Sequence, residues 1–388
     1  MEAHSRGAGS YGEGAVTIET GGGFFRADSR TARDLGVLLA HRLAARGPLR
    51  VLDLMAGCGI RSLRYGVEAG ASLVWANDAD AGRRPLLEAN LAALPAACRG
   101  RVSCRTAQQL LALVLMRRQR FELVDLDAFG SPTALLPGAL EAVAMGGVLF
   151  VASSDGRSPT GHDRTAAVRR LGAAARAHPA SWELALRLQL GSVARAAWAQ
   201  GRGITPLLNI SEGRTFRTAV QLDQHPGRGE EALLGLLAHC NGCGDQQVQS
   251  LLQLGRWAPC RCGSAAPLAV SGPLWIGPLQ ASAELATLAT TPAMASASRR
   301  QLARLVADPG EPARCWPMAL IAQQLGGGPP PLAALANALQ QRGHRAGVSG
   351  VMAGQLRSDA PWPLILAVAG ELAGHNGRTS DAAPGHGL

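Results

Sequence analysis

Residues 121–132, FELVDLDAFGSP, place an acid, a small residue, an aromatic ring and a glycine directly after an apolar run. Methylation of an exocyclic amino group on a base needs such a set, because the lone pair of an aryl amine is delocalised into the ring. A carboxylate and a backbone carbonyl can each accept one N–H of the amine and so direct its lone pair outward, while an aromatic side chain stacks on the base. We therefore predict Asp127 and the carbonyl of Ala128 as the two acceptors, and Phe129 as the stacking face.

The same residues also fit an ordinary strand followed by a Gly-Ser-Pro turn. A motif of this length is not specific on its own, and both interpretations stay open at this point.

A second motif, LRVLDLMAGCGIR at 49–61, lies where the chemistry requires a cofactor. Gly57 and Gly59 allow close backbone approach, and the helix start that follows can bind polar groups. A dinucleotide site would carry a third glycine at the position of Ser62. Asp53 instead favours S-adenosylmethionine, because it can neutralise the amino group of the methionine moiety.

The next apolar run, SLVWAND, ends in Asp78, which is placed to take the ribose hydroxyls of a nucleotide-type βαβ unit. Taken singly, Asp53 also fits a turn and Asp78 a helix cap. The ordered set of acids and glycines favours the cofactor site.

Four of the eight cysteines form a cluster that reads CNGC and then CRC: Cys240, Cys243, Cys260 and Cys262. Two close pairs of thiolates suit a tetrahedral zinc ion. The C-x-C spacing of the second pair is tighter than usual, and disulfides are the alternative. The scattered cysteines are typical of small core residues in a reducing compartment, which argues against disulfides.

The elements that must position these residues alternate between strand and helix in the first half of the chain, as a doubly wound α/β sheet requires. We predict strands at 49–55, 72–77, 101–105, 121–127 and 147–153, and helices near 31–46, 60–69, 80–93 and 133–145. Two β-like runs flank Glu212-Gly213 and predict a final antiparallel hairpin, which suits a methyltransferase better than a dehydrogenase. The second half predicts a mixed α+β domain.

These patterns predict a methyltransferase domain over 1–222, a linker at 223–231, a C-terminal domain over 232–370 and a disordered tail at 371–388. No apolar run reaches membrane-spanning length, and the N-terminus lacks an apolar signal core. We expect a soluble, monomeric, cytoplasmic protein that does not bind membranes.

The net charge is +10, and all 38 basic residues are arginine. Residues 157–217 hold ten arginines against three acids. Arginine forks onto phosphates, so the surplus indicates nucleic acid binding. A solvated charged face is the alternative, although such a face usually mixes the two signs.

Together these motifs resemble the tRNA (guanine-26-N2)-dimethyltransferases over residues 11–362. The resemblance rests on RDL at 33–35, DLMAGCGIR at 53–61, AND at 76–78, DLDAFGSP at 125–132, WELALRL at 182–188 and GPLWIGPL at 272–279. It implies a Rossmann-like class I methyltransferase domain with a C-terminal domain peculiar to the family, and methylation of N2 of a tRNA guanine from S-adenosylmethionine.

By that resemblance Arg33, Arg61 and Asp78 match cofactor-binding positions, Asp127 matches the catalytic acid, and the four clustered cysteines match a zinc site. Two departures matter. Ala128 replaces a proline of the family, which keeps the carbonyl but loses a rigid φ. Thr106 replaces an acid that reads the adenine amino group, with Ala107 expected to pack on the ring, so we expect weaker cofactor binding.

We therefore expect methylation of guanine 26 in tRNA, to N2,N2-dimethylguanine, with arginines and the C-terminal domain holding the tRNA. Two alternatives stay open. One is an amino methyltransferase acting on another nucleic acid, and the other is a tRNA-binding protein whose methyltransferase site has decayed.

Overall fold

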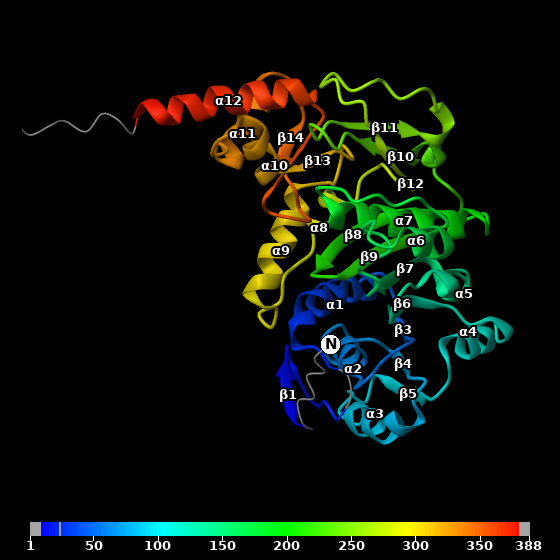
Figure 1. The fold of residues 1–388 in the computed structure, drawn as a ribbon. Coiled ribbons are helices and arrows are strands. Elements are labelled where there is room, and N and C mark those ends of the chain that lie inside the picture. Colours follow the sequence, from blue (N-terminus) through cyan, green and yellow to red (C-terminus); the bar gives the residue numbers. More distant parts are fainter. Residues whose placement is uncertain (1–8, 23–24, 380–388) are drawn as a thin grey trace, which may run out of the picture.

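The computed structural model describes residues 9–22 and 25–379. Its centre is a seven-stranded sheet with the strand order β5-β4-β3-β6-β7-β9-β8 (Figure 1). The strands are β3 (Arg50–Asp53), β4 (Leu73–Asn77), β5 (Arg99–Ser103), β6 (Phe121–Ala128), β7 (Val143–Ser153), β8 (Gly203–Glu212) and β9 (Thr215–Asp223). Neighbouring strands from β5 to β7 are parallel, and β9 is antiparallel to both β7 and β8. The expected α/β sheet with a final hairpin is confirmed.

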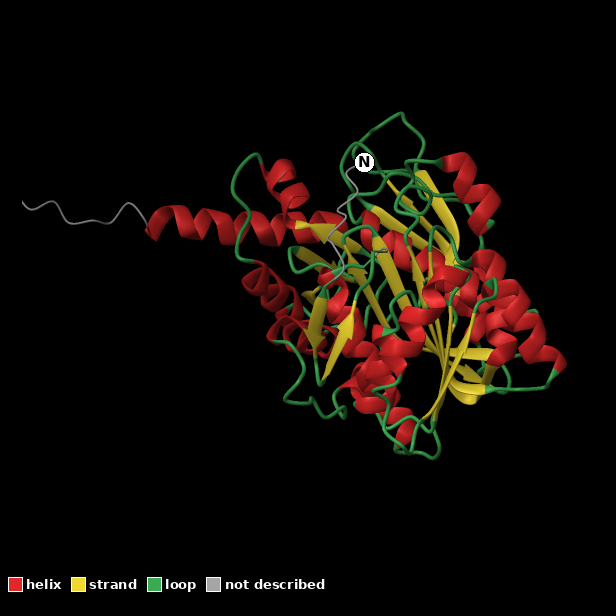
Figure 2. Cartoon of the chain, turned by 90° about the horizontal axis from the view of Figure 1, so that it is seen from below, coloured by secondary structure: helices red, strands yellow, loops and turns green. Residues whose placement is uncertain are grey.

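Helices cover both faces of this sheet, because strands buried on both faces need an apolar layer on each side (Figure 2). Successive strand residues alternate between the two layers. Leu52 packs in the core under α4, α5 and α7, and Val51 packs in the core under α1 and α2. The helices are α1 (Arg30–Ala44), α2 (Ile60–Val67), α3 (Arg84–Leu91), α4 (Ala107–Met116), α5 (Leu136–Ala142), α6 (Arg164–Leu171) and α7 (Ser181–Trp198).

Two elements of this half were not expected from the sequence. The hairpin of β1 (Ser10–Glu13) and β2 (Val16–Glu19) packs apolar side chains against α2. Helix α4 begins with a capping box in which the Thr106 hydroxyl accepts from the Gln109 amide at 3.2 Å. The Thr-x-x-Gln pattern is typical of a helix N-terminus, but we did not predict a helix there.

The second half holds two three-stranded sheets, ordered β11-β10-β12 and β13-β15-β14. Their strands are β10 (Leu234–His239), β11 (Gln246–Ser250), β12 (Ala269–Trp275), β13 (Cys315–Pro317), β14 (Ala346–Val348) and β15 (Gln355–Ser358). The helices are α8 (Ser282–Leu285), α9 (Ser296–Ala307), α10 (Met318–Leu325), α11 (Leu332–Gln341) and α12 (Trp362–Thr379). Short 3₁₀ helices are η1 (Ala27–Ser29), η2 (Ala81–Arg83), η3 (Thr133–Leu135), η4 (Glu230–Leu233) and η5 (Leu251–Gln253).

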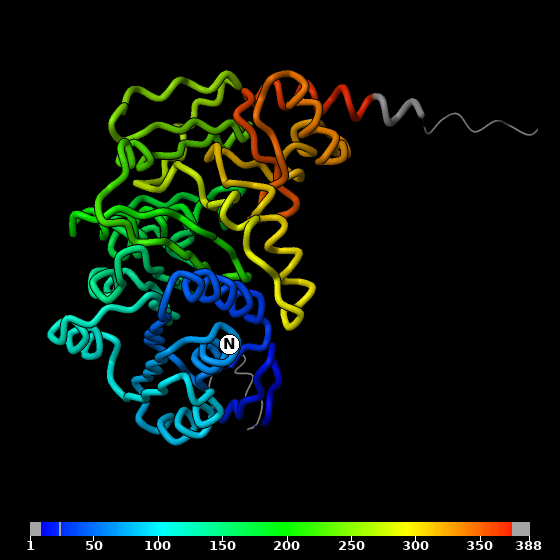
Figure 3. The backbone as a smooth tube through the Cα atoms, turned by 180° about the vertical axis from the view of Figure 1, so that it is seen from behind, coloured from blue at the N-terminus to red at the C-terminus, as the bar shows by residue number. Residues whose placement is uncertain are grey.

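The second half is joined tightly to the first (Figure 3). Strand β12 packs against α7, where a Cβ at Gly191 would lie 3.1 Å from the Leu274 Cα. The buried Glu183 of α7 accepts from Arg357 of β15 at 2.6 and 2.7 Å. Glu230, which lies inside the expected linker 223–231, accepts from the Trp198 indole at 2.7 Å.

The expected tail needs one correction. Residues 371–379 continue α12 because its apolar residues from Trp362 onward pack on α10 and α11, and residues 380–388 lie outside the described part of the chain. Among the described residues, no helix combines the length and apolar character that crossing a bilayer requires.

Candidate active site

Three acids and a glycine-rich loop meet at the carboxyl edge of the central sheet. Asp53 ends β3, Asp78 directly follows β4, and Asp127 is the penultimate residue of β6. Strands β3 and β6 are neighbours, and the strand order changes direction between them. In open α/β sheets a ligand crevice forms at this point.

The loop after β3 is shaped to hold a ligand against its backbone. Gly57 has φ +60°, and a Cβ added there would meet no atom within 4 Å. Its amide donates to Asp78 Oδ2 at 3.0 Å, which fixes the loop against β4. Gly59, at φ +83°, is the N-cap of α2, so the helix starts at the crevice.

Asp53 is fully buried and accepts from the Ser62 hydroxyl through Oδ2 at 2.7 Å. Its Oδ1 is buried with no hydrogen-bond partner among the described residues. Burial, followed by the charge of Asp125, raises the pKa of Asp53 to about 8. A buried carboxylate with an open acceptor position fits the ammonium group of a methionine moiety.

Arg61, in the first turn of α2, lies below the crevice between two acids. Its guanidinium is 3.6 Å from Asp125 and 3.3 Å from Asp127. Its Nη1 has no hydrogen bond among the described residues. Burial lowers the pKa of Arg61, but Asp125 and Asp127 outweigh it and raise the pKa above its usual value, so this cation is permanent.

Asp127 is held from both sides by arginines that contact the same oxygen. Arg217 donates to Oδ2 at 3.2 Å, and Arg61 lies 3.3 Å from the same atom. Burial alone would raise the pKa of Asp127, but Arg217 and then Arg61 lower it below its usual value. Within the described chain Oδ1 has no partner, so the ionised carboxylate keeps one oxygen available to accept hydrogen bonds from a ligand.

Arg217 is the functional candidate that the sequence interpretation missed. It lies on β9 in register with Ala152 of β7, which is in register with Asp127 of β6. The small Ala152 lets the Arg217 side chain cross β7, and Glu212 Oε2 holds Arg217 Nε at 3.0 Å. The one available signal was an arginine inside the apolar run RTFRTAVQL.

The loop after Asp127 is fixed by β7. The Gly130 amide donates to the Ser154 hydroxyl at 2.7 Å, and the Gly130 carbonyl accepts from the Ser153 hydroxyl at 3.0 Å. These bonds order a loop that lacks the rigid proline at Ala128. Phe129 is 73 % exposed at its tip, on the solvent side of the carboxyl edge.

Arg33 and its partners form a buried ionic cluster beside the crevice. The guanidinium donates to both oxygens of Glu13, at 2.7 and 2.6 Å, and stacks 5.4 Å from the Phe25 ring. Burial raises the pKa of Cys58, and the charge of Arg33 opposes that rise; the same charge adds to the effect of Arg217 and Arg61 in lowering the pKa of Asp127. Arg33 therefore lies near both motifs, and its contact with cofactor stays a prediction.

The two residues expected at the adenine have structural roles of their own. Thr106 caps α4, and Ala107 is 6 % exposed within the main core cluster. A hydroxyl oxygen can accept a second hydrogen bond, so Thr106 can still contact a ligand. Both assignments stay predictions.

The four clustered cysteines are brought together as expected. Their sulfur atoms all lie within 4.8 Å of one another. The distances between sulfur atoms include 3.6 Å for Cys240 and Cys262, and 3.3 Å for Cys243 and Cys260. A disulfide would need about 2.05 Å, and all eight cysteines are free thiols.

Fewer arginines of the basic segment 157–217 are available at the surface than its composition indicated. Arg187 bonds Glu183, Arg195 bonds the carbonyls ending α6, Arg202 pairs with Glu141, and Arg217 is buried at Asp127. The exposed remainder includes Arg157, Arg164 and Arg169, on α6 and the loop that leads to it from the carboxyl end of β7.

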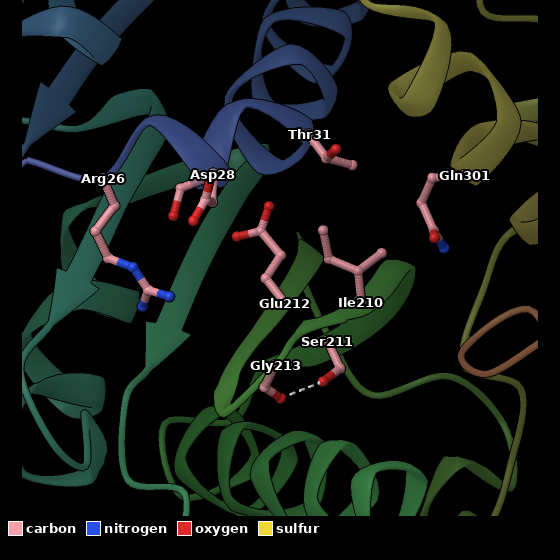
Figure 4. Close-up of a pocket in the computed structure, with 9 residues that line it drawn as sticks. Arg26, Asp28, Thr31, Ile210, Ser211, Glu212, Gly213 and Gln301 are labelled. Carbon is pink, nitrogen blue, oxygen red and sulfur yellow. Dashed lines mark hydrogen bonds between the residues drawn. The ribbon is translucent and has the colours of Figure 1, made fainter.

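A pocket of about 380 Å³ adjoins the site on its C-terminal side (Figure 4). Arg26 and Asp28 line one wall, Gln301 of α9 the opposite one, and Glu212 points in between them. Glu212 also accepts from Arg217, which in turn donates to Asp127, so these contacts connect the pocket to the candidate site.

Comparison with known proteins gives a consistent result. The family model described as N2,N2-dimethylguanosine tRNA methyltransferase matches residues 13–369. A tRNA (guanine(26)-N(2))-dimethyltransferase of Methanosphaerula palustris is 31% identical over 351 residues, covering 89% of this chain and 90% of the relative. One from Thermococcus kodakarensis is 28% identical over 353 residues, covering 87% and 90%.

Among solved structures, Trm1 from Pyrococcus horikoshii in complex with S-adenosyl-L-methionine has a similar fold. The TM-score is 0.79 at 22% identity, over 92% of this chain and 99% of that one.

Proposed function

The chain belongs to the N2,N2-dimethylguanosine tRNA methyltransferase family, and from this premise we propose that it methylates N2 of guanine 26 in tRNA, using S-adenosylmethionine, to N2,N2-dimethylguanine. The observation that carries the proposal is the geometry at Asp127. Two arginines hold one carboxylate oxygen and keep the group ionised, while the other oxygen has no partner within the described chain, at the carboxyl edge of the sheet beside Asp53 and Asp78.

The target guanine must leave its stack to reach this crevice, because its amino group lies in the duplex groove. Asp127 Oδ1 accepts one N2–H, the Ala128 carbonyl accepts the other, and Phe129 stacks on the ring. These contacts direct the nitrogen lone pair toward the methyl donor. Once the nitrogen has gained a methyl group its acidity rises sharply, so its proton leaves to Asp127 or to water. Most of the acceleration comes from orientation.

S-adenosylmethionine, when bound, supplies an electrophilic methyl group on a sulfonium. Asp53 Oδ1 would hold its ammonium group, and Arg61 Nη1, which makes no hydrogen bond within the described chain, its carboxylate. The backbone of Gly57 and Gly59 would approach the ligand closely, and Asp78 would hold the ribose hydroxyls. Arg33 would support this edge, and Thr106 and Ala107 would flank the adenine.

The four clustered cysteines would hold one structural zinc ion. A tetrahedral site with Zn–S bonds near 2.3 Å places its sulfur atoms about 3.8 Å apart. The separations of 3.3 to 3.6 Å between free thiols are close to that spacing and far from a disulfide.

The tRNA would be held by the exposed arginines of α6 and its preceding loop, together with the C-terminal domain. We assign residues 1–222 to the methyltransferase domain, 223–231 to a linker and 232–370 to the C-terminal domain. The eight free thiols favour a reducing compartment, so we place the enzyme in the cytoplasm, as a monomer.

The direct test is mass spectrometry of nucleosides from unmodified tRNA after incubation with purified protein and S-adenosylmethionine. We expect N2-methylguanine and then N2,N2-dimethylguanine at position 26, and neither with Asp127→Asn. Calorimetric titration with S-adenosylmethionine is the companion measurement. A protein that binds no cofactor and leaves tRNA unmodified would contradict the proposal.

A further inference from the structure

A second positively charged surface lies on the edge of the central sheet, outside the site and outside residues 157–217. Four arginines on β5, on the loop after it and at the end of α4 form this β5–α4 arginine face: Arg99, Arg101, Arg105 and Arg117. Residues 89–121, which carry the face, hold six arginines and no aspartate or glutamate.

The guanidinium groups of the other three arginines act on that of Arg101. After burial, the charges of Arg117, Arg99 and Arg105 lower the pKa of Arg101. Arg101 lies flat on the buried Trp75 ring, 3.5 Å from its centroid, and Trp75 is its partner on β4. The core therefore holds one cation of the face in place, and the others gather around it.

None of the four makes an ion pair or a side-chain hydrogen bond anywhere in residues 9–22 and 25–379. Arginines that serve the fold behave differently in this chain. Arg33 and Arg64, for example, each bond buried carboxylates. Like charges gathered without internal partners weaken the folded state slightly, so the fold itself does not account for the face.

The position of the face suits a long, anionic partner that also enters the crevice. Asp127 lies on the central strand β6, and β5 is three strands away, about 14 Å at usual strand spacing. The C-terminal half packs against α7 and β8 at the other end of the sheet (Figure 1). The catalytic acid therefore lies between two surfaces that can bind RNA.

Exposed apolar side chains extend the face. Leu115 and Met116, at the end of α4, are 47 % and 82 % exposed, directly before Arg117. The helix projects from the edge of the molecule (Figures 1 and 3). Apolar side chains beside arginines can contact sugars and bases while the guanidinium groups bind phosphates.

We propose that the β5–α4 arginine face binds the phosphate backbone of the tRNA on the side of the target nucleotide away from the C-terminal half. The inference rests on the proposed function, since it takes the partner to be the same tRNA. An RNA chain continues on both sides of a flipped nucleotide, so two binding surfaces, one on each side, hold the backbone open more firmly than one surface does. Arginine suits the task because its planar fork matches a phosphate.

The test compares Arg99→Gln/Arg117→Gln with a control that removes the same charge, Arg46→Gln/Arg228→Gln. The control residues are exposed and lie away from the face, at the end of α1 and in the linker. The equilibrium constant for tRNA binding is measured at salt concentrations from about 50 to about 300 mM, which span the physiological range. Methyl transfer and the calorimetric affinity for S-adenosylmethionine are measured on the same variants.

We expect the slope of log K against log salt to shrink by about 2 in the face variant, one for each lost phosphate contact. Its KM for tRNA should rise, while transfer at saturating tRNA and cofactor affinity stay unchanged. A slope and KM equal to those of the control would overturn the inference. So would retained tRNA binding with lost affinity for phosphatidylserine vesicles, which would indicate a membrane surface. A wild-type protein that binds tRNA with the expected slope but transfers no methyl group would count against the proposed function alone.

Discussion

Removing Arg217 should slow methyl transfer without affecting cofactor binding. Arg217→Gln leaves Asp127 with Arg61 as its one ionic partner among the described residues, and it frees the oxygen that Arg217 held at 3.2 Å. A hydrogen bond to a charged group contributes about 1.5–3 kcal/mol. Since about 1.4 kcal/mol corresponds to a factor of ten, we expect single-turnover transfer at pH 8 to fall about 10- to 100-fold.

The pH profile separates positioning from general damage. Burial raises the pKa of Asp127, and Arg217 is the largest cause that lowers it. In the wild type Asp127 stays ionised between pH 6 and 8, a range that is about two to four units above the ordinary pKa of an aspartate. Its protonation state therefore does not change the rate in this range. Without Arg217 its pKa rises, so the variant should lose most at low pH and recover as pH increases. Arg217→Lys keeps the charge and should restore part of the rate.

Two comparisons make this test decisive. Arg202→Gln also removes a partly buried ion pair, between the turn before β8 and Glu141 of α5, and should lower stability without changing the pH profile. In an Asp127→Asn background, Arg217→Gln should cost little, because the charge it holds is gone. A wild-type rate and profile for Arg217→Gln, or an undiminished effect in the Asp127→Asn background, would refute the assignment.

Three further outcomes are expected. Asp127→Ala should reduce transfer by about 10²–10⁴-fold while calorimetry finds nearly unchanged cofactor affinity; near-normal single-turnover transfer would exclude its role. Metal analysis should find about one zinc per chain, and Cys243→Ser or chelation should loosen the C-terminal half first in proteolysis; a zinc-free protein of normal stability would remove the metal site. Burial raises the pKa of Glu183, but Arg357 and Arg187 outweigh it and lower the pKa to about 2. The stabilisation from Glu183, about 3 kcal/mol, should therefore be present above about pH 4.5 and be lost as pH falls toward 2. Denaturant unfolding between pH 7 and 3 measures this loss in the free energy of unfolding. Glu183→Gln should remove that part of the pH dependence. An unchanged pH dependence in the variant would mean that the ion pair contributes nothing.

The motifs could be read from the sequence because each depends on residues that are close in the chain. A strand that ends in an acid, followed by Gly57 and Gly59, requires a particular backbone path whatever surrounds it. The same holds for the run that ends at Asp127 and for the hairpin around Gly213. The signal for helix α4 was equally local, because its Thr106 capping box lies within four residues. We did not predict this helix because we compared that segment only with the cofactor-binding motif of the family.

The sequence by itself determined the α/β order, the glycine-rich loop after β3, the position of Asp127 at a strand end and the cysteine cluster, since short-range periodicity and spacing encode them. Only the tertiary structure decided which arginines serve the site and which serve the surface. Arg217 is 90 residues from Asp127, and the two meet because β9 and β6 flank β7 in one register. The arginines of β5 and α4 form a face because the sheet places β5 at its edge, where none of them forms an ion pair with an acid in the described part of the chain. Composition counts charges, but the pairing of strands decides which of them are neutralised.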